Sequence, residues 1–449
     1  MPSPQSADSG PSGGSRLNRL FGWLGRDPVY ERWRWQIFAV TWLAYAGLNL
    51  TRKSFPVAKI DIGHGTPLGL TGPEMAWVDG AFLLAYAVGQ FFWGIAGDRF
   101  GTRRVILVGM LCSIVVGAAM GTADSASAFI VYSAIQGLCQ SCGWAPLLKN
   151  VGEFFSRREH GFVIGLWCTN YAIGGLAASG LAGFAGELFG WRWAFYAPAA
   201  ALFVIWCLFL ALQRNRPEDV GLPPIETYHG EPQPLVKAGD AAEEEAEGSW
   251  AVIGEVIRSP VILLLSLVYF FLKPARYALL LWAPKYISDR LGVGMGESGM
   301  LSGVFELAGP ASVLLAGYIS DRYFGTRRMP ICIIFLVLLA GMLLVLDRLP
   351  HKGWILALGL LLLGFLVYAP DMIVSGVAAV DFGTRKGAST ASGVINGIGS
   401  IGTVLGGTLP GFLLERWGWQ GVFGALAGSA LLAALLMVPK WNALPPEAK

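Results

Sequence analysis

Apolar residues recur along the chain in blocks of about twenty, separated by short polar stretches. A helix of about twenty residues crosses the ~30 Å hydrocarbon layer of a bilayer, whereas the strands of a membrane barrel alternate apolar and polar positions. The pattern therefore predicts an all-α, polytopic membrane protein with twelve transmembrane helices in two halves. The predicted spans are 33–55, 74–97, 104–121, 126–149, 161–185 and 193–212, then 259–285, 297–319, 329–347, 353–378, 387–413 and 418–438.

The polar segments complete the predicted organisation. Residues 1–32 are rich in Ser, Gly and Pro and lack the apolar core of a cleaved signal, so they are predicted to be a disordered cytoplasmic tail. Residues 33–212 and 259–438 form two six-helix bundles. Between them, 213–258 is a cytoplasmic linker with an acidic run, and 439–449 is a second cytoplasmic tail.

Composition agrees with a membrane protein and excludes other classes. The chain is 54% hydrophobic and 14% charged, against about 25% charged residues in soluble proteins. All six cysteines lie in apolar blocks and the four histidines lie outside them, so no disulfide framework or metal site is expected. The sequence has no nucleophile–base pair and no nucleotide-binding loop. We expect no enzyme activity, no cofactor and no nucleic-acid partner.

Basic residues gather in the loops on one side of the predicted membrane. Cytoplasmic loops are enriched in Lys and Arg, so both termini and the linker are predicted to be cytoplasmic, in a bacterial inner membrane. The basic residues of the loops after spans 2, 4, 8 and 10 are Arg99, Arg103 and Arg104; Arg157 and Arg158; Arg322, Arg327 and Arg328; and Arg385 and Lys386.

One of these loops occurs in both halves. GIAGDRFGTRR begins at Gly94, and GYISDRYFGTRR begins at Gly317, with one residue inserted. Asp98 and Asp321 of these loops are separated by nearly the same number of residues as two arginines inside apolar blocks, Arg52 and Arg276. The spacing predicts a parallel repeat of two six-helix halves, with a binding site between them at the middle of the membrane.

Arg52 and Arg276 are the strongest candidates for substrate binding. An arginine at the bilayer centre costs roughly 2.5–3.5 kcal/mol on insertion scales, so such residues usually face a cavity. A phosphate group offers between one and two negative charges and three acceptor oxygens, and a guanidinium presents a matching planar fork of donors. We predict that the two arginines grip one phosphate from both sides. The alternative is that each arginine snorkels or pairs with a carboxylate such as Glu306.

Short motifs in the spans and linker accompany the repeated loops. They are RKSF at 52–55, GWAP at 143–146, PEDVGLPPIE at 217–226, RY at 276–277, ELAG at 306–309 and YAP at 368–370. These motifs resemble those of the major facilitator superfamily and, within it, of the organophosphate:inorganic phosphate antiporters, which carry glycerol phosphate and hexose phosphates. The resemblance covers residues 34–440. It implies that Arg52 and Arg276 are the ligands of the substrate phosphate.

The remaining candidates surround these arginines or lie at the membrane surface. For each aromatic or amide residue, ordinary helix packing is the alternative. The predicted substrate-binding residues are Arg52, Arg276, Lys53, Lys273, Tyr45, Trp144, Tyr171, Tyr277, Tyr368 and Asn396. The residues predicted to act in gating or coupling are Asp98, Arg99, Arg103, Asp321, Arg322, Arg327, Glu306, Asp371 and Asp79.

Two positions depart from the resembled family. Gln90 stands where the family has a lysine in span 2, and Tyr171 stands where its glycerol-phosphate branch has a histidine in span 5. Lys273 is a candidate to restore the lost positive charge. Asp371 is a candidate for three roles, which the sequence leaves open: a proton-linked carboxylate, a counter-ion to Lys273, or a contact for a cationic part of the substrate.

We therefore predict a secondary transporter that moves a phosphorylated small organic anion, such as a sugar phosphate, in exchange for inorganic phosphate. It would work by rocker-switch alternating access, as a monomer surrounded by membrane lipid. Two alternatives remain open. One is a proton-coupled symporter of organic anions, and the other is a transporter-like sensor of external sugar phosphate, a role that some members of the resembled family have.

Overall fold

The computed structural model describes residues 27–63, 68–156, 159–229, 258–324, 327–377 and 388–442. Most of the predicted N-terminal tail (1–26), the acidic part of the linker (230–257) and the end of the second tail (443–449) lie outside the described residues.

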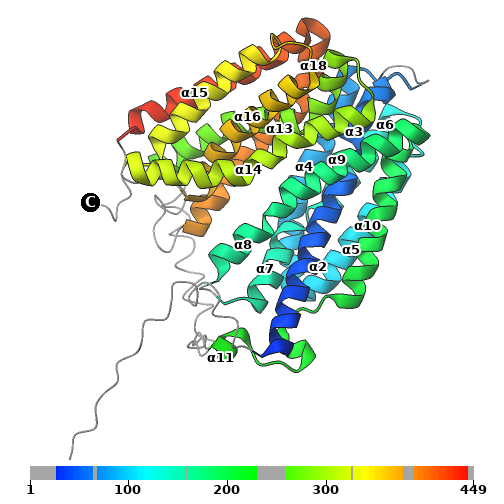
Figure 1. Ribbon diagram of the computed structural model, residues 1–449, viewed down its shortest axis with the longest axis vertical. Helices are drawn as coiled ribbons and strands as arrows, with labels where there is room; N and C mark the ends of the chain where they lie inside the picture. The colour runs from blue at the N-terminus through cyan, green and yellow to red at the C-terminus, as the bar shows by residue number, and fades with distance from the viewer. Residues whose placement is uncertain are drawn as a thin grey trace, which may run out of the picture.

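The first bundle contains six spans, three of which are broken into two helices (Figure 1). The breaks fall at Lys53, at residues 141–143 and at Cys168. In chain order the helices are α2 (Pro28–Arg52) with α3 (Ser54–Gly63), α4 (Gly72–Phe100), α5 (Thr102–Met120), α6 (Ala126–Gln140) with α7 (Trp144–Phe154), α8 (His160–Trp167) with α9 (Thr169–Phe189), and α10 (Trp193–Leu212).

The second bundle follows two short helices of the linker, η1 (Pro217–Val220) and α11 (Ile225–His229). Its α18 contains two spans, because Gly418 has a φ of 62° and breaks the helix there. The helices are α13 (Pro260–Leu291), α14 (Met295–Tyr323), α15 (Met329–Leu346), α16 (Gly353–Met372) with the π-helical turn η2 (Ile373–Val377), α18 (Ala388–Met437) and the 3-10 turn η3 (Val438–Lys440).

The described helices thus make twelve spans in two bundles, and no strand occurs among the described residues. Eight helical stretches of this part of the chain are long and apolar enough to cross a membrane by length and hydropathy alone. The prediction of an all-α, twelve-helix membrane protein is therefore confirmed.

The end of the bundles at which the linker lies is the linker side, and the other end is the opposite side. On the linker side, α2 begins, α10 ends and α13 begins; on the opposite side, α3 ends and α4 and α14 begin. The start of the linker is attached to the first bundle, since the side-chain amide of Asn150 donates to the carbonyl oxygens of Arg214 and Asn215 at 2.9 and 2.8 Å. The ring of Tyr228 stacks on that of Tyr30 at 3.9 Å.

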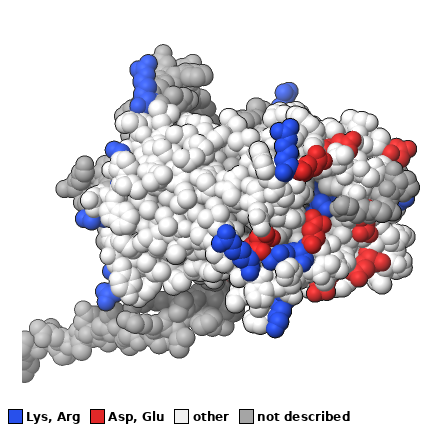
Figure 2. All heavy atoms as spheres, turned by 90° about the horizontal axis from the view of Figure 1, so that it is seen from above, with Lys and Arg blue, Asp and Glu red and all other residues white. Residues whose placement is uncertain are grey.

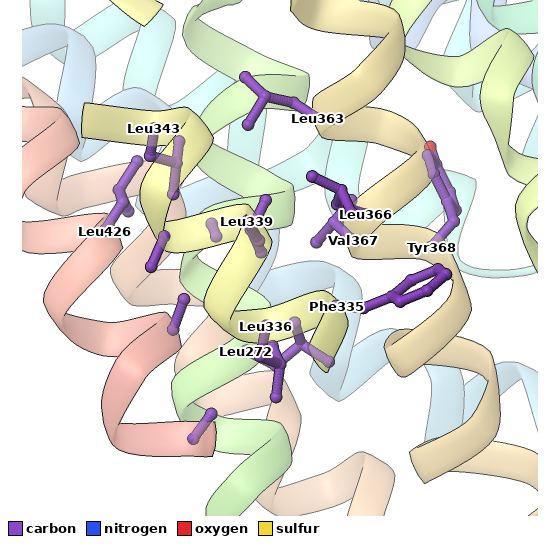
Figure 3. Packing of buried hydrophobic residues seen from close by; sticks show 14 of the residues in the cluster. Leu272, Phe335, Leu336, Leu339, Leu343, Leu363, Leu366, Val367, Tyr368 and Leu426 are labelled. Atoms are coloured by element: carbon purple, nitrogen blue, oxygen red, sulfur yellow. The ribbon is translucent and has the colours of Figure 1, made fainter. Parts of the chain in front are cut away.

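Each bundle has its own apolar core. In the second bundle, α15 supplies a row of buried leucines at helical spacing, Leu336, Leu339 and Leu343 (Figure 3). They belong to one cluster with Leu363 of α16 and Leu426 of α18. Large apolar side chains also cover the outside of the helices, and Figure 2 shows a broad uncharged surface, with Asp and Glu gathered toward one side of the view and Lys and Arg on both sides. Such a surface suits hydrocarbon.

The bundles lie side by side and approach each other near α3 and α18 (Figure 1). Glycines permit the close approach on the opposite side. A Cβ at Gly411 of α18 would lie 2.2 Å from the carbonyl oxygen of Gly72, and one at Gly299 of α14 would lie 2.4 Å from that of Ser179. The N–H of Gly296 also donates across the interface to Glu187 at 2.7 Å. Small residues let membrane helices pack backbone to backbone, so these contacts join the bundles on the opposite side.

Candidate functional site

Arg52 is the last residue of α2, at the point where the first span breaks. Its Nε donates to Oε1 of Gln140 at 3.0 Å, and its guanidinium lies 4.9 Å from the ring centre of Tyr86 on α4. Nη2 is buried and has no hydrogen-bond partner among the described residues. A buried donor without a partner is costly, so this guanidinium is oriented by one bond and retains donor capacity for an anion.

Aromatic residues of the first bundle lie beside Arg52. The hydroxyls of Tyr45 and Tyr171 are hydrogen-bonded at 2.6 Å, and the Trp144 ring lies 5.6 and 5.5 Å from these two rings. Tyr171 therefore orients the Tyr45 hydroxyl instead of supplying a cation. Gln90 is exposed one helical turn after Tyr86 on α4, and an amide there adds no charge either.

The second bundle supplies two cations from α13. Arg276 Nη1 donates to Oδ2 of Asp371, and Lys273 Nζ lies 3.7 Å from Oδ1 of the same carboxylate. The Arg276 guanidinium lies 4.6 Å from the ring centre of Tyr368, and Lys273 lies 4.6 Å from that of Tyr269. The helix continues through Pro274, so Lys273 and Arg276 stay on one face. Asp371 is thus a counter-ion of both cations in this structure.

Tyr277 connects the two sets of cations. It lies within electrostatic range of Arg52 in the first bundle and of Lys273 and Arg276 in the second. Arg52 of the first bundle and Arg276 of the second therefore lie near the same tyrosine. Asn396, also a predicted substrate ligand, has an exposed side chain on α18.

Lys53 and Glu306 form an ion pair that joins the bundles. Each residue is 5% exposed, and Lys53 Nζ also donates to the carbonyl oxygen of Leu280 at 3.4 Å. Pro284 has no N–H, so the Leu280 carbonyl lacks its usual helical donor four residues later. A Cβ at Gly175 of α9 would overlap the Glu306 carboxylate, at 1.4 Å from Oε2. Glycine at this position makes room for the pair.

A second buried pair, Lys59 with Asp79, lies further toward the opposite side. The two residues are 0% and 3% exposed. Both belong to the first bundle, but Lys59 Nζ donates to the carbonyl oxygen of Leu281 at 3.1 Å and lies 4.0 Å from the ring centre of Trp282, both in the second. Sequence reasoning selected Asp79 and missed Lys59, although a lysine beyond Arg52 in an apolar stretch was an available signal.

The candidates at the membrane surface are only partly described. Arg99 and Arg322 are exposed. Arg103 donates through Nη2 to the carbonyl oxygen of Leu210 at 2.5 Å and through its backbone N–H to Asn215 at 2.9 Å, so it ties its loop to the start of the linker. Arg327 donates to the side-chain oxygen of Asn442 at 3.1 Å. The side chains of Asp98 and Asp321 lie outside the described part of the chain.

Comparison with known proteins identifies the family and the fold. Residues 37–396 match the family model of the Major Facilitator Superfamily. The chain belongs to this superfamily. Among solved structures, a bacterial homolog of the lysosomal transporter Spinster, in an inward-facing and unoccupied conformation, has the same fold, with a TM-score of 0.70 at 15% identity over 91% of this chain and 96% of that one. No group of three or more His, Cys, Asp or Glu in the described residues could hold a metal ion.

Curated relatives extend over nearly the whole chain. The chain is 29% identical to the "Glycerol-3-phosphate transporter" of Bacillus subtilis, over 93% of this chain and 94% of the relative. It is 29% identical to the "Membrane sensor protein UhpC" of Salmonella typhimurium (94% and 94%) and 28% identical to the "Glucose-6-phosphate exchanger SLC37A2" of Xenopus laevis (93% and 94%). The family predicted from the motifs is confirmed, and so is the prediction of a multi-pass membrane protein that is not an enzyme.

Proposed function

We propose that this protein is a secondary carrier that exchanges a phosphorylated small organic anion, such as a sugar phosphate, for inorganic phosphate. The observation that supports it best is the pair of guanidiniums, Arg52 and Arg276, which come from the two bundles and lie near the same tyrosine, Tyr277. Each has a buried nitrogen without a hydrogen-bond partner among the described residues, Nη2 and Nε respectively. Phosphate oxygens are acceptors whose geometry matches the planar N–H donors of a guanidinium.

The charge of the site also supports a phosphate. Among the described residues near Tyr277, Arg52, Lys273 and Arg276 are positive and Asp371 is negative, whereas Lys53 is neutralised by Glu306. The balance is two positive charges. A phosphate monoester carries up to two negative charges near neutral pH and would neutralise them. An uncharged sugar would leave both charges buried without compensation, which is costly.

Alternating access follows from the contacts between the bundles. In this structure the Lys53–Glu306 pair, the Lys59–Leu281 hydrogen bond and the glycine contacts hold the bundles together on the opposite side. Opening that side requires these contacts to separate. A phosphate held by Arg52 and Arg276 screens their repulsion and draws the bundles together, so a loaded carrier changes state more easily than an empty one. Exchange is the expected result.

The proposal includes a location and an assembly. We assign the linker side to the cytoplasm, since the basic loops belong to it, and the protein to a bacterial cell membrane. The carrier acts as a monomer in lipid. Its transported partners are the organic phosphate and inorganic phosphate.

Uptake by proteoliposomes tests the exchange. Vesicles that contain the full chain and internal inorganic phosphate are expected to take up labelled glucose 6-phosphate or glycerol 3-phosphate at least about tenfold faster than vesicles without internal phosphate, because the empty carrier returns slowly. External inorganic phosphate is expected to compete, and glucose is not.

Three other outcomes would contradict the exchange. Uptake that needs a pH gradient and ignores internal phosphate would favour a proton-coupled symporter. Binding of a sugar phosphate without flux would favour a sensor, in keeping with the similarity to the sensor protein of Salmonella typhimurium. Transport that inorganic phosphate does not inhibit would exclude the phosphate site itself.

A further inference from the structure

We propose that Asp371 is a specificity-determining residue, which sets how many negative charges the bound anion should carry. This inference rests on the proposed function of the same site. It goes beyond a role as counter-ion, because it states what the carboxylate does to the choice between anions of the same shape and different charge.

Asp371 is held where it can have this effect. It is 1% exposed and lies near the end of α16, directly after Pro370 and before the π-helical turn. One oxygen accepts a hydrogen bond from Arg276, and the other, 3.7 Å from Lys273 Nζ, has no hydrogen-bond partner among the described residues. The carboxylate therefore faces the two cations that the second bundle offers to an anion.

The other buried carboxylates described near the site each form an ion pair with a lysine of their own. Glu306 pairs with Lys53, and Asp79 pairs with Lys59. Asp371 is different, because it shares cations that are needed for the substrate. While it is ionised, it lowers the positive potential at the site by one unit charge. It also occupies one Nη donor of Arg276 in the empty carrier.

The two effects of Asp371 can be separated by ligand charge. Occupying a donor of Arg276 weakens every tetrahedral oxyanion by a similar factor. The lowered potential weakens an anion in proportion to its charge, because the Coulomb energy is proportional to the product of the two charges. At distances of up to about 12 Å and an effective dielectric constant of about 20, one unit charge changes the affinity by at least about tenfold per unit of ligand charge.

The decisive experiment compares glucose 6-phosphate with glucose 6-sulfate at pH 8. Both have the same sugar and a tetrahedral oxyanion, but the phosphate carries close to two charges and the sulfate monoester carries one. Dissociation constants are measured by titration calorimetry on the purified full chain. In Asp371→Asn, we expect both ligands to bind more tightly and the preference for phosphate over sulfate to rise by at least about tenfold. An unchanged or smaller preference would overturn the inference.

Two further variants complete the experiment. Asp347→Asn is the matched control, since Asp347 also lies beside an arginine of α13, Arg290, at 3.8 Å, but on the opposite side, beyond the site; its preference should equal that of the wild type. Lys273→Gln should lower the preference for phosphate by at least about tenfold, by the same argument with the opposite sign. This variant keeps the inference testable if Asp371→Asn does not fold, and a rise in preference would refute it.

The design separates this inference from the proposed function. If the wild-type chain binds neither inorganic phosphate nor glucose 6-phosphate, the proposed function fails. If the wild type binds both and the phosphate-to-sulfate preference is the same in Asp371→Asn, the phosphate site stands and only the role of Asp371 is lost.

Discussion

Replacement of Arg276 or of Arg52 by glutamine is expected to abolish phosphate exchange and to weaken inorganic phosphate binding by at least about 30-fold. Loss of one member of a buried, hydrogen-bonded charge pair typically costs about 2–5 kcal/mol. Arg276→Gln has an additional effect, because Lys273, at 3.7 Å, is then the one cation left beside Asp371 among the described residues. The measurements are calorimetric binding of inorganic phosphate and phosphate self-exchange in proteoliposomes.

Control variants separate the effect of the planar guanidinium donors on phosphate binding from the effect of the positive charge. Arg276→Lys keeps the charge but loses the planar pair of donors, so it should bind phosphate with an intermediate affinity. Arg290→Gln is the matched control outside the site. Arg290 lies on the same helix and donates to the carbonyl oxygen of Leu349 at 3.0 Å, so its loss should leave phosphate affinity unchanged. Wild-type affinity in the Arg52→Gln, Arg276→Gln double variant would exclude a phosphate site between the bundles.

The sequence was sufficient to predict the fold and to select the two arginines as candidate ligands, for a physical reason. Blocks of about twenty apolar residues have few solutions other than membrane helices, and a charge inside such a block is too costly to be accidental. The internal repeat then related Arg52 to Arg276 and placed them at equivalent positions of two bundles. Neither of these two inferences requires knowledge of the distances between side chains.

The pairing of charges could not be predicted, because it depends on how the helices are packed. The sequence grouped Lys53 with the substrate ligands, yet the break after Arg52 directs Lys53 to Glu306 of the other bundle. The role of Asp371 was left open among three possibilities, with Lys273 as the one named counter-ion, and the approach of α16 to α13 brings the carboxylate to Arg276 as well as to Lys273. Gln140 and Tyr86, which hold Arg52, carried no signal in the sequence.

Lys59→Met is expected to destabilise the protein by about 3–5 kcal/mol, because it leaves Asp79 as a buried charge without its partner. Asp79→Asn should act similarly by leaving Lys59 unpaired. The loss should appear as a clear fall in the thermal unfolding temperature of the purified chain. A surface pair provides the comparison: Arg216 lies 3.8 Å from Glu153 and is 62% exposed, and Arg216→Gln should cost no more than about 1 kcal/mol.

A double variant distinguishes a gate from a purely structural ion pair. Lys59→Met combined with Asp79→Leu removes both charges, and apolar replacement of a buried pair is often neutral or stabilising. Stability should therefore recover. The hydrogen bond from Lys59 to Leu281 and the contact with Trp282 would still be absent, so the closed arrangement on the opposite side would be weaker and the exchange rate should still differ from the wild type. Recovery of both stability and exchange would mean that the pair stabilises the first bundle and takes no part in opening the opposite side.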